Sequence, residues 1–324
     1  MVKLGTTGPE VFPLGLGCMG FSGVFGASND DESIATIRAA IDAGVTLLDT
    51  GDFYGMGHNE MLVGKAIAGR RDRVQLSVKF GGLRAPNGTF LGIDCRPAAV
   101  KNFVSYSLKR LGVDVIDVYR PARLDPAVPI EDTIGAISEL VEAGYVKHIA
   151  LSEMGVETVR RAHATHPIVD LQIEYAISTR GPEAKLFPAL HELGISATPY
   201  GVLGHGLLGG SVSGPGDGRA HLPRFAEENR TKNDAVVVTF RRFAEARGMT
   251  AAELAIAWVL AKEPRFVPVI GVKNRTQLAG ALGALEHTLS ATDLAELEAA
   301  VPPDALSGER YAPALMKFLD SERG

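Results

Sequence analysis

The chain has 324 residues, of which 46% are hydrophobic and 22% charged, a balance typical of globular proteins with a buried core. A formal net charge of −5 argues against nucleic acid as the main partner, so an anionic ligand would require a local cluster of positive charge. Two cysteines provide neither a disulfide framework nor a cysteine metal site, which favours a reducing compartment.

The sequence carries no signal for membranes or metals. No stretch approaches the ~20 consecutive apolar residues of a membrane helix, and the first residues lack the pattern of a signal peptide. The eight histidines are scattered, with no pair at ligand spacing beside a third ligand. We therefore expect a cytoplasmic protein without a metal site.

The N-terminus predicts a small β-hairpin, because residues 2–4 and 10–12 flank a turn-rich segment. Such a hairpin is suited to plug one end of a barrel. Short apolar runs then alternate with amphipathic stretches. The predicted strands are 14–17, 45–48, 74–78, 115–119, 148–151, 168–173, 195–198 and 266–270. The predicted helices are 30–43, 97–111, 130–143, 156–164, 182–193, 234–247, 251–261 and 276–285.

Strict alternation of buried strands and amphipathic helices predicts a parallel sheet. Eight such units predict a single (β/α)8 TIM barrel over residues 1–324, with an open doubly wound sheet as the alternative. The long segment 201–230, rich in Gly and Pro, predicts an extended functional loop at the carboxyl ends of the strands. Active sites of barrels lie at those ends, so the residues that follow each strand are the candidates for chemistry.

Three such residues form a candidate proton-donor site. Asp49 and Tyr54 follow the second predicted strand, and Lys79 follows the third. A nearby ammonium group favours the phenolate, which makes a tyrosine a stronger acid, and a paired aspartate holds the lysine in place. The alternative is a structural Asp–Lys ion pair beside a packed tyrosine.

The segments that contain these residues resemble the signatures of a known family. The stretch from Asp49 to Gly55 (DTGDFYG), the pair Val78-Lys79 and the stretch from Leu171 to Tyr175 (LQIEY) are similar to motifs of aldo-keto reductases. The resemblance runs from residue 4 to about residue 285 and is greatest to a bacterial branch that includes pyridoxal reductase-like enzymes. It implies NADPH-dependent reduction of a small aldehyde or ketone to an alcohol.

In that resemblance Tyr54 is the general acid, Lys79 lowers its pKa and Asp49 pairs with Lys79. The family's fourth catalytic residue, a histidine, falls at Ala122 within the segment YRPARLDP. Loss of a positioned proton donor typically costs about 10²–10⁴-fold in rate. Three outcomes stay open: reduction persists with Tyr54 and a water; Arg120, two residues earlier on the same strand face, supplies the donor or contacts substrate; or only nucleotide binding remains.

Further alternatives concern the chemistry and Arg120 itself. Arg120 is equally compatible with a salt bridge that closes a layer of the barrel. Without the histidine the site is also compatible with altered chemistry, such as redox-neutral processing of a sugar or reduction of a C=C bond.

The resemblance also implies a nicotinamide site. Ser152 and Gln172 would bind the carboxamide and Tyr200 would stack on the ring, although Ser152 as a helix cap and Gln172 as a barrel hydrogen-bonding group are alternatives. The other cofactor contacts implied are Met19, Gly201, Leu203, Gly204 and Gly206, with Gly271, Lys273 and Gln277 at the adenosine end.

At the adenosine end Lys273 is the candidate for the 2′-phosphate of NADPH, while Gln277 replaces an arginine of the family. We therefore expect NADPH to be preferred over NADH, but less strongly than is usual. His205, within the pyrophosphate loop, is expected to be solvated.

Overall fold

A computed structural model describes residues 1–24, 26–209, 219 and 222–323. Its main sheet contains eight parallel strands in the order β11-β10-β9-β8-β5-β4-β3-β12. These are β3 (Gly15–Gly17), β4 (Leu47–Gly51), β5 (Gln75–Phe80), β8 (Ile116–Pro121), β9 (Val146–Ser152), β10 (Ile168–Glu174), β11 (Ser196–Tyr200) and β12 (Val269–Gly271). The backbone N–H of Val267, just before β12, donates to the carbonyl of Ala197 in β11 at 3.0 Å. This bond brings the two ends of the sheet together, which confirms the barrel over the open sheet.

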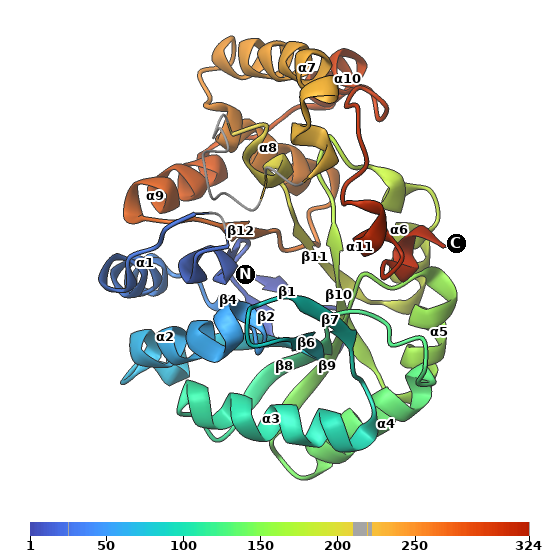
Figure 1. The fold of residues 1–324 in the computed structure, drawn as a ribbon. Coiled ribbons are helices and arrows are strands. Elements are labelled where there is room, and N and C mark those ends of the chain that lie inside the picture. Colours follow the sequence, from blue (N-terminus) through green and yellow to red (C-terminus); the bar gives the residue numbers. More distant parts are fainter. Residues whose placement is uncertain (25, 210–218, 220–221, 324) are drawn as a thin grey trace.

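Helices surround the strands (Figure 1). They are α1 (Asp30–Asp42), α2 (His58–Ile67), α3 (Pro97–Leu111), α4 (Ile130–Glu142), α5 (Val156–Thr165), α6 (Leu186–Leu193), α7 (Glu227–Glu245), α8 (Ala251–Lys262), α9 (Arg275–Gly283), α10 (Ala291–Ala300) and α11 (Pro313–Met316). Side-chain caps fix several starts: Asn29 accepts from the N–H of Glu32, and Thr250 forms a capping box with Glu253.

The predicted helices are present, but α2, α10 and α11 were not predicted, and α7 starts earlier than expected. Helix α7 begins seven residues before its expected start at 234, because its first turns are polar and carry no apolar stripe. Helix α2 buries Leu62, Val63 and Ile67, and α10 begins with a capping box at Ser290. Both therefore had sequence signals, a helical apolar face and a Ser-x-x-Asp start.

The N-terminal hairpin closes the amino end of the barrel. Strands β1 (Val2–Lys3) and β2 (Glu10–Val11) pair as expected. Leu4 and Val11 pack against Leu47 and Val269, which stand at the starts of β4 and β12. A second hairpin, β6 (Gly82–Arg84) with β7 (Phe90–Ile93), follows β5 and was not predicted. The carboxyl end of the barrel is therefore the end left for a site.

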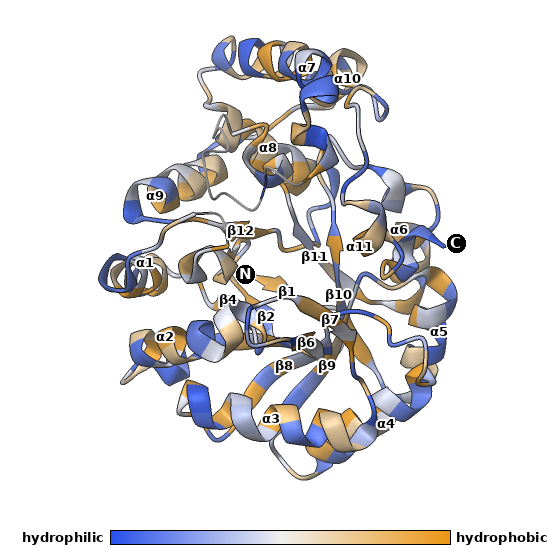
Figure 2. Ribbon diagram, in the orientation of Figure 1, coloured by the Kyte–Doolittle hydropathy of each residue, from blue (hydrophilic) through white to orange (hydrophobic). Residues whose placement is uncertain are grey.

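Hydrophilic residues interrupt the hydrophobic strands, as Figure 2 shows. Several are buried charged or hydroxyl groups inside the barrel, including Ser77, Arg120, Asp170 and Thr198. In the part of the chain that the structure describes, no helix has the length and apolar character needed to cross a bilayer. Over the same residues, no three His, Cys, Asp or Glu side chains gather in a way that would hold a metal ion.

Candidate active site

Asp49 and Lys79 form a buried ion pair at the carboxyl ends of two adjacent strands. Strands β4 and β5 pair so that Asp49 lies beside Ser77 and Gly51 beside Lys79. The Nζ of Lys79 contacts Oδ1 of Asp49. The other carboxylate oxygen, Oδ2, accepts from Ser77 Oγ at 2.8 Å and from Gln172 Nε2 at 2.9 Å. These contacts satisfy the carboxylate from three sides, so the position of Lys79 is fixed.

Tyr54 lies against this pair in the turn that follows β4. A methyl group at Gly51 would lie 3.4 Å from two carbons of the Tyr54 ring, so the ring lies directly against the end of β4. The Nζ of Lys79 lies 5.2 Å from the centre of that ring, and Phe53 packs edge-on against it at 4.9 Å. The structure thus brings together all three residues expected to deliver a proton.

Burial dominates the electrostatics of the three groups. It raises the pKa of Tyr54 well above its ordinary value, the charge of Asp49 raises it further, and Arg123 acts to lower it. Burial also lowers the pKa of Lys79, which Asp49 opposes, while Arg120 lowers it further. The net shift of Tyr54 is therefore upward rather than downward as expected from Lys79 alone. A phenol with a raised pKa holds its proton at neutral pH, as a general acid must before reaction.

Arg120 does not enter the site. Its side chain has no exposed surface, and Nη1 pairs with Oδ1 of Asp170 at 2.6 Å while Nη2 donates to Ser77 Oγ at 2.9 Å. Arg120 lies within β8, whereas Ala122 follows the end of that strand, so Arg120 lies deeper in the barrel. The geometry corresponds to the salt bridge within the barrel layer, not to a contact with substrate.

Arg123 is a site residue that sequence reasoning missed. It directly follows Ala122, which is 3% exposed, and its side chain is only partly buried. The Nη1 of Arg123 donates to the carbonyl of Ala122 at 2.6 Å and to Ser152 Oγ at 3.5 Å. The available signal was its position directly after Ala122, since the chain leaves β8 there and no longer alternates as a strand.

The residues expected to surround the nicotinamide lie at the ends of neighbouring strands. Gln172 of β10 pairs in register with Ser152 of β9, and Tyr200 ends β11. Ser152 and Gln172 are 1% and 4% exposed. Met19 follows β3, where the N–H of Cys18 donates to the carbonyl of Asp49 at 2.8 Å. These positions therefore form one edge beside the Asp49–Lys79 pair.

The C-terminal tail reaches the same edge. Arg310 donates to Oε2 of Glu153 at 3.0 Å and to Oε2 of Glu174 at 3.1 Å. The hydroxyl of Tyr200 donates to Glu153 Oε1 at 2.7 Å and lies 3.1 Å from that of Tyr311. Glu153 has a φ of 53°, a conformation that costs free energy in a residue with a side chain. The tail contacts hold this strained residue next to Ser152.

The loop after β11 contains Gly201, Leu203, Gly204 and Gly206. A methyl group at Gly201, whose φ is 68°, would lie 3.0 Å from Cγ of Glu174, so this position requires glycine. His205 was expected to be solvated, but its Nε2 lies 3.4 Å from Oε2 of Glu174 and its side chain is largely buried. The Ser-Gly-Pro-Gly-Asp-Gly stretch of the predicted loop, within 210–218, lies outside the described residues.

The adenosine end expected at α9 uses several of its groups internally. Gly271 ends β12, and the backbone N–H of Lys273 donates to Gln277 Oε1 at 2.8 Å. Glu32 of α1 accepts from the backbone N–H of Arg275 at 3.1 Å and pairs with its Nη2 at 3.0 Å. A carboxylate therefore stands at the helix start where an anionic phosphate would be favoured.

Comparison with known proteins identifies relatives along nearly the whole chain. Residues 13–302 match the model of the Aldo/keto reductase family. The chain is 41% identical over 324 residues to a protein of Glycine max named probable aldo-keto reductase 1, covering 98% of this chain and 93% of that one.

Two solved structures share the fold. A glycerol dehydrogenase from Gluconobacter oxydans is similar with a TM-score of 0.82 at 25% identity, covering 94% of this chain and 96% of its own. The holo form of an aldo-keto reductase from Bacillus halodurans is similar with a TM-score of 0.79 at 26% identity, covering 96% and 98%.

Proposed function

This chain belongs to the aldo/keto reductase family, and on that premise we propose that it catalyses the NADPH-dependent reduction of a small aldehyde or ketone to an alcohol. The observation that carries the proposal is the meeting of Asp49, Lys79 and Tyr54 at the carboxyl ends of β4 and β5. Protonation of a carbonyl oxygen needs a general acid and a cation that stabilises the conjugate base of that acid. It also needs a carboxylate that orients the cation.

Each group has a distinct task. A bound nicotinamide would supply the hydride to the carbonyl carbon. The Tyr54 hydroxyl donates its proton to the carbonyl oxygen as the alcohol forms. The ammonium of Lys79 stabilises the phenolate that results. Asp49 limits the cost of burying that ammonium, and Ser77 and Gln172 orient the carboxylate.

The residues present fit a nicotinamide cofactor. Gln172 uses one N–H on Asp49, which leaves a second N–H and its carbonyl oxygen for a carboxamide, and the Ser152 hydroxyl lies on the adjacent strand. We assign these two to the carboxamide and Tyr200 to the ring. A side chain at Gly271 would meet no atom within 4 Å, so the backbone there is open to a ligand. Met19, Gly201, Leu203, Gly204, Gly206, Gly271, Lys273 and Gln277 are the further proposed contacts.

We also propose that Ala122 occupies the position of the histidine in pyridoxal reductase-like relatives, and that residues 1–324 act as one catalytic domain. The second point is supported by Arg310, which joins the tail to Glu153 at the end of β9. The methyl group of Ala122 offers no donor, which favours two further candidates: a nucleotide-binding protein with little turnover, or altered chemistry at the same site.

Oxidation of NADPH, followed at its absorbance band, tests the proposal with pyridoxal, methylglyoxal and nitrobenzaldehyde as substrates. Turnover should fall by at least about 10²-fold in Tyr54→Phe because the ring remains but its proton does not. Tyr106→Phe, an exposed tyrosine on α3, is the matched control and should retain full rate. Tight binding of NADPH without oxidation would support the nucleotide-binding candidate. Product analysis separates alcohol formation from altered chemistry.

A further inference from the structure

We propose that the site selects carbonyl substrates that carry a carboxylate, with Arg123 as the residue that binds the carboxylate and Arg84 as a second positive charge nearby. This inference rests on the reductase function proposed above and names the class of its substrate.

Arg123 has unused hydrogen-bonding capacity at the site. Both of its hydrogen bonds, to the carbonyl of Ala122 and to Ser152, are made by Nη1. Among the residues described by the structure, no carboxylate lies within 4 Å of its guanidinium, and Nε and Nη2 make no hydrogen bond. A planar guanidinium with two free nitrogens matches the two oxygens of a carboxylate.

Arg123 is also coupled to the reacting groups. Burial acts to lower its pKa, but the nearby Tyr200, Glu153 and Tyr311 outweigh this and raise it, so the side chain stays cationic. Its charge in turn acts to lower the pKa of Tyr54. A substrate held by Arg123 would therefore lie close to both the proton donor and Ser152 of the proposed nicotinamide edge.

Arg84 adds a second positive charge beside the Phe53–Tyr54 ring pair. Its Cζ lies 6.0 Å from the centre of the Phe53 ring, and Phe53 packs against Tyr54. Its Nη1 donates to the carbonyl of Gly88 at 3.1 Å, and no carboxylate in the described ranges lies within 4 Å of it. A chain with a net charge of −5 repels anions at long range, so two cations beside the proton donor provide the local positive field that an anionic substrate requires.

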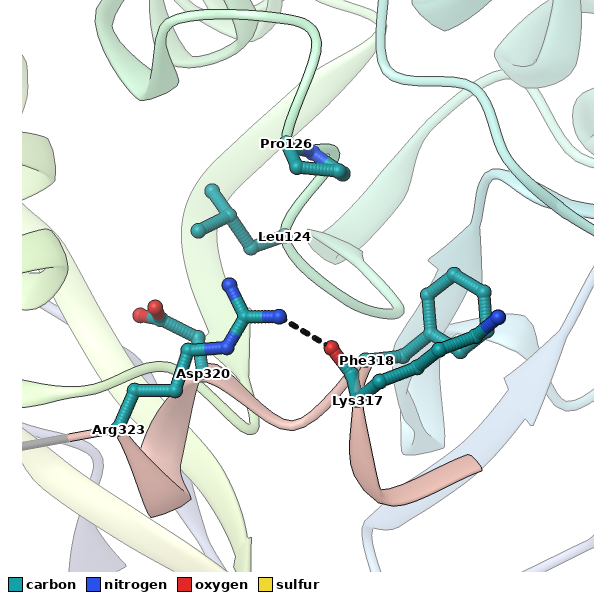
Figure 3. A pocket seen from close by; sticks show the side chains of 6 residues that line it. All are labelled: Leu124, Pro126, Lys317, Phe318, Asp320 and Arg323. Atoms are coloured by element: carbon teal, nitrogen blue, oxygen red, sulfur yellow. Dashed lines mark hydrogen bonds between the residues drawn. The ribbon is translucent and has the colours of Figure 1, made fainter. Parts of the chain in front are cut away.

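A cavity is lined in part by Leu124, the residue that follows Arg123 in the chain. It has a volume of about 270 Å³ and lies between Leu124 and Pro126 on one side and Phe318 of the tail on the other (Figure 3). Lys317, Asp320 and Arg323 complete its lining. The carboxylate of Asp320 is held against the backbone, since its Oδ2 accepts from the N–H of Gly155 at 2.8 Å. The cavity thus combines an apolar wall with two cationic side chains.

The test compares 4-carboxybenzaldehyde with its neutral methyl ester, methyl 4-formylbenzoate. Wild-type protein should reduce the acid with a kcat/KM at least about tenfold above that of the ester. Arg123→Ala should lose about tenfold or more on the acid through KM and change little on the ester. Arg123→Lys keeps the charge but not the two-pronged geometry. Its kcat/KM on the acid should fall between those of wild type and Arg123→Ala. Arg242→Ala, an exposed arginine on α7, controls for net charge and should match wild type.

Equal kcat/KM for acid and ester in wild type, or an equal loss on both in Arg123→Ala, would overturn the proposal. Pyridoxal and pyridoxal 5′-phosphate form a second pair: a preference for the phosphate alone would also overturn the assignment to a carboxylate. If neither aldehyde is turned over, calorimetry with 4-(hydroxymethyl)benzoate and its methyl ester separates the two proposals. Binding of the acid that disappears in Arg123→Ala would support the carboxylate site while the reductase function fails. Equal or absent binding of both would refute the site.

Discussion

The guanidinium of Arg120 and the carboxylate of Asp170 form a two-pronged ion pair inside the barrel, with Nη1–Oδ1 at 2.6 Å and Nη2–Oδ2 at 3.1 Å. Neither side chain has exposed surface. Replacing Arg120 with methionine should destabilise the fold by about 3–5 kcal/mol, because Asp170 would be left buried without its partner. Denaturant unfolding followed by circular dichroism measures this loss.

The double variant Arg120→Met with Asp170→Leu removes both charges and should recover much of the stability. A normally stable Arg120→Met protein with a reduced kcat/KM would instead assign Arg120 to substrate binding. Comparison of the single and double variants thus separates a role of Arg120 in the barrel layer from a role in the active site.

The sequence predicted the barrel because its signals are local. Eight apolar runs alternate with amphipathic helices, and each run reappears as a strand within a few residues. Asp49, Tyr54 and Lys79 could be predicted to meet because the carboxyl ends of adjacent parallel strands share one edge. Both inferences need only the order of elements and the direction of the strands.

Other parts of the site depend on distances between side chains, which the order of helices and strands does not provide. Arg120 and Ala122 share a strand face, but only the register shows that Arg120 faces Asp170 rather than the site. Arg310 is more than 150 residues from its partner Glu153, and the tail that carries it lacks a strand or heptad pattern from which its path could be read. Contacts of this kind follow from packing of the whole chain and have no local signal.

Glu32 is expected to oppose binding of the 2′-phosphate of NADPH. Its carboxylate accepts from the backbone N–H of Arg275 at 3.1 Å and from its side chain, at the start of α9. Replacing Glu32 with glutamine should tighten binding of NADPH by about three- to tenfold and leave that of NADH nearly unchanged, because only NADPH places a phosphate there. Fluorescence titration of both cofactors gives the two Kd values.

The gain should shrink at high salt, since Arg275 is exposed and Glu32 is only half-buried. Glu139→Gln, which removes a more exposed glutamate paired with Lys101, should leave both Kd values as in wild type. A Glu32→Gln protein whose Kd for NADH improves as much as that for NADPH would show that the carboxylate does not act on the 2′-phosphate.

Arg310 is expected to hold the C-terminal tail over the edge of the barrel that contains Ser152, Gln172 and Tyr200. It is 6% exposed and pairs with Glu153, Glu174 and Glu322. Arg310→Ala should weaken NADPH binding and expose the tail to protease, because Glu153 and Glu174 would be left buried without a cation. Limited proteolysis with mass spectrometry, together with the Kd for NADPH, measures both effects.

Arg265→Ala, an exposed arginine outside the tail, serves as the control. Unchanged cleavage and an unchanged Kd in Arg310→Ala would show that other contacts, such as that between Gly155 and Asp320, suffice to hold the tail.

Asp52 should make the stability of the protein depend on pH. Burial raises the pKa of its carboxyl to about 8, the charge of Glu60 contributes to the rise, and Arg110 opposes it. Between the ordinary pKa of 3.8 and about 8, the folded state binds a proton that the unfolded state has released. The stability that this proton provides is complete below the unfolded pKa and is lost as the pH rises through the folded value.

Asp52→Asn keeps the shape without the titration. Between pH 6 and pH 9 the wild-type protein should lose roughly 2–3 kcal/mol relative to Asp52→Asn, at up to about 1.4 kcal/mol for each pH unit. Urea unfolding of both proteins at several pH values measures this difference, with the exposed Asp114→Asn as a control that should follow wild type. Parallel pH profiles for wild type and Asp52→Asn would mean that the carboxyl is already ionised at pH 6. In that case the segment between β4 and Tyr54 would have to tolerate a buried charge, and no loss of stability near pH 8 could be traced to Asp52.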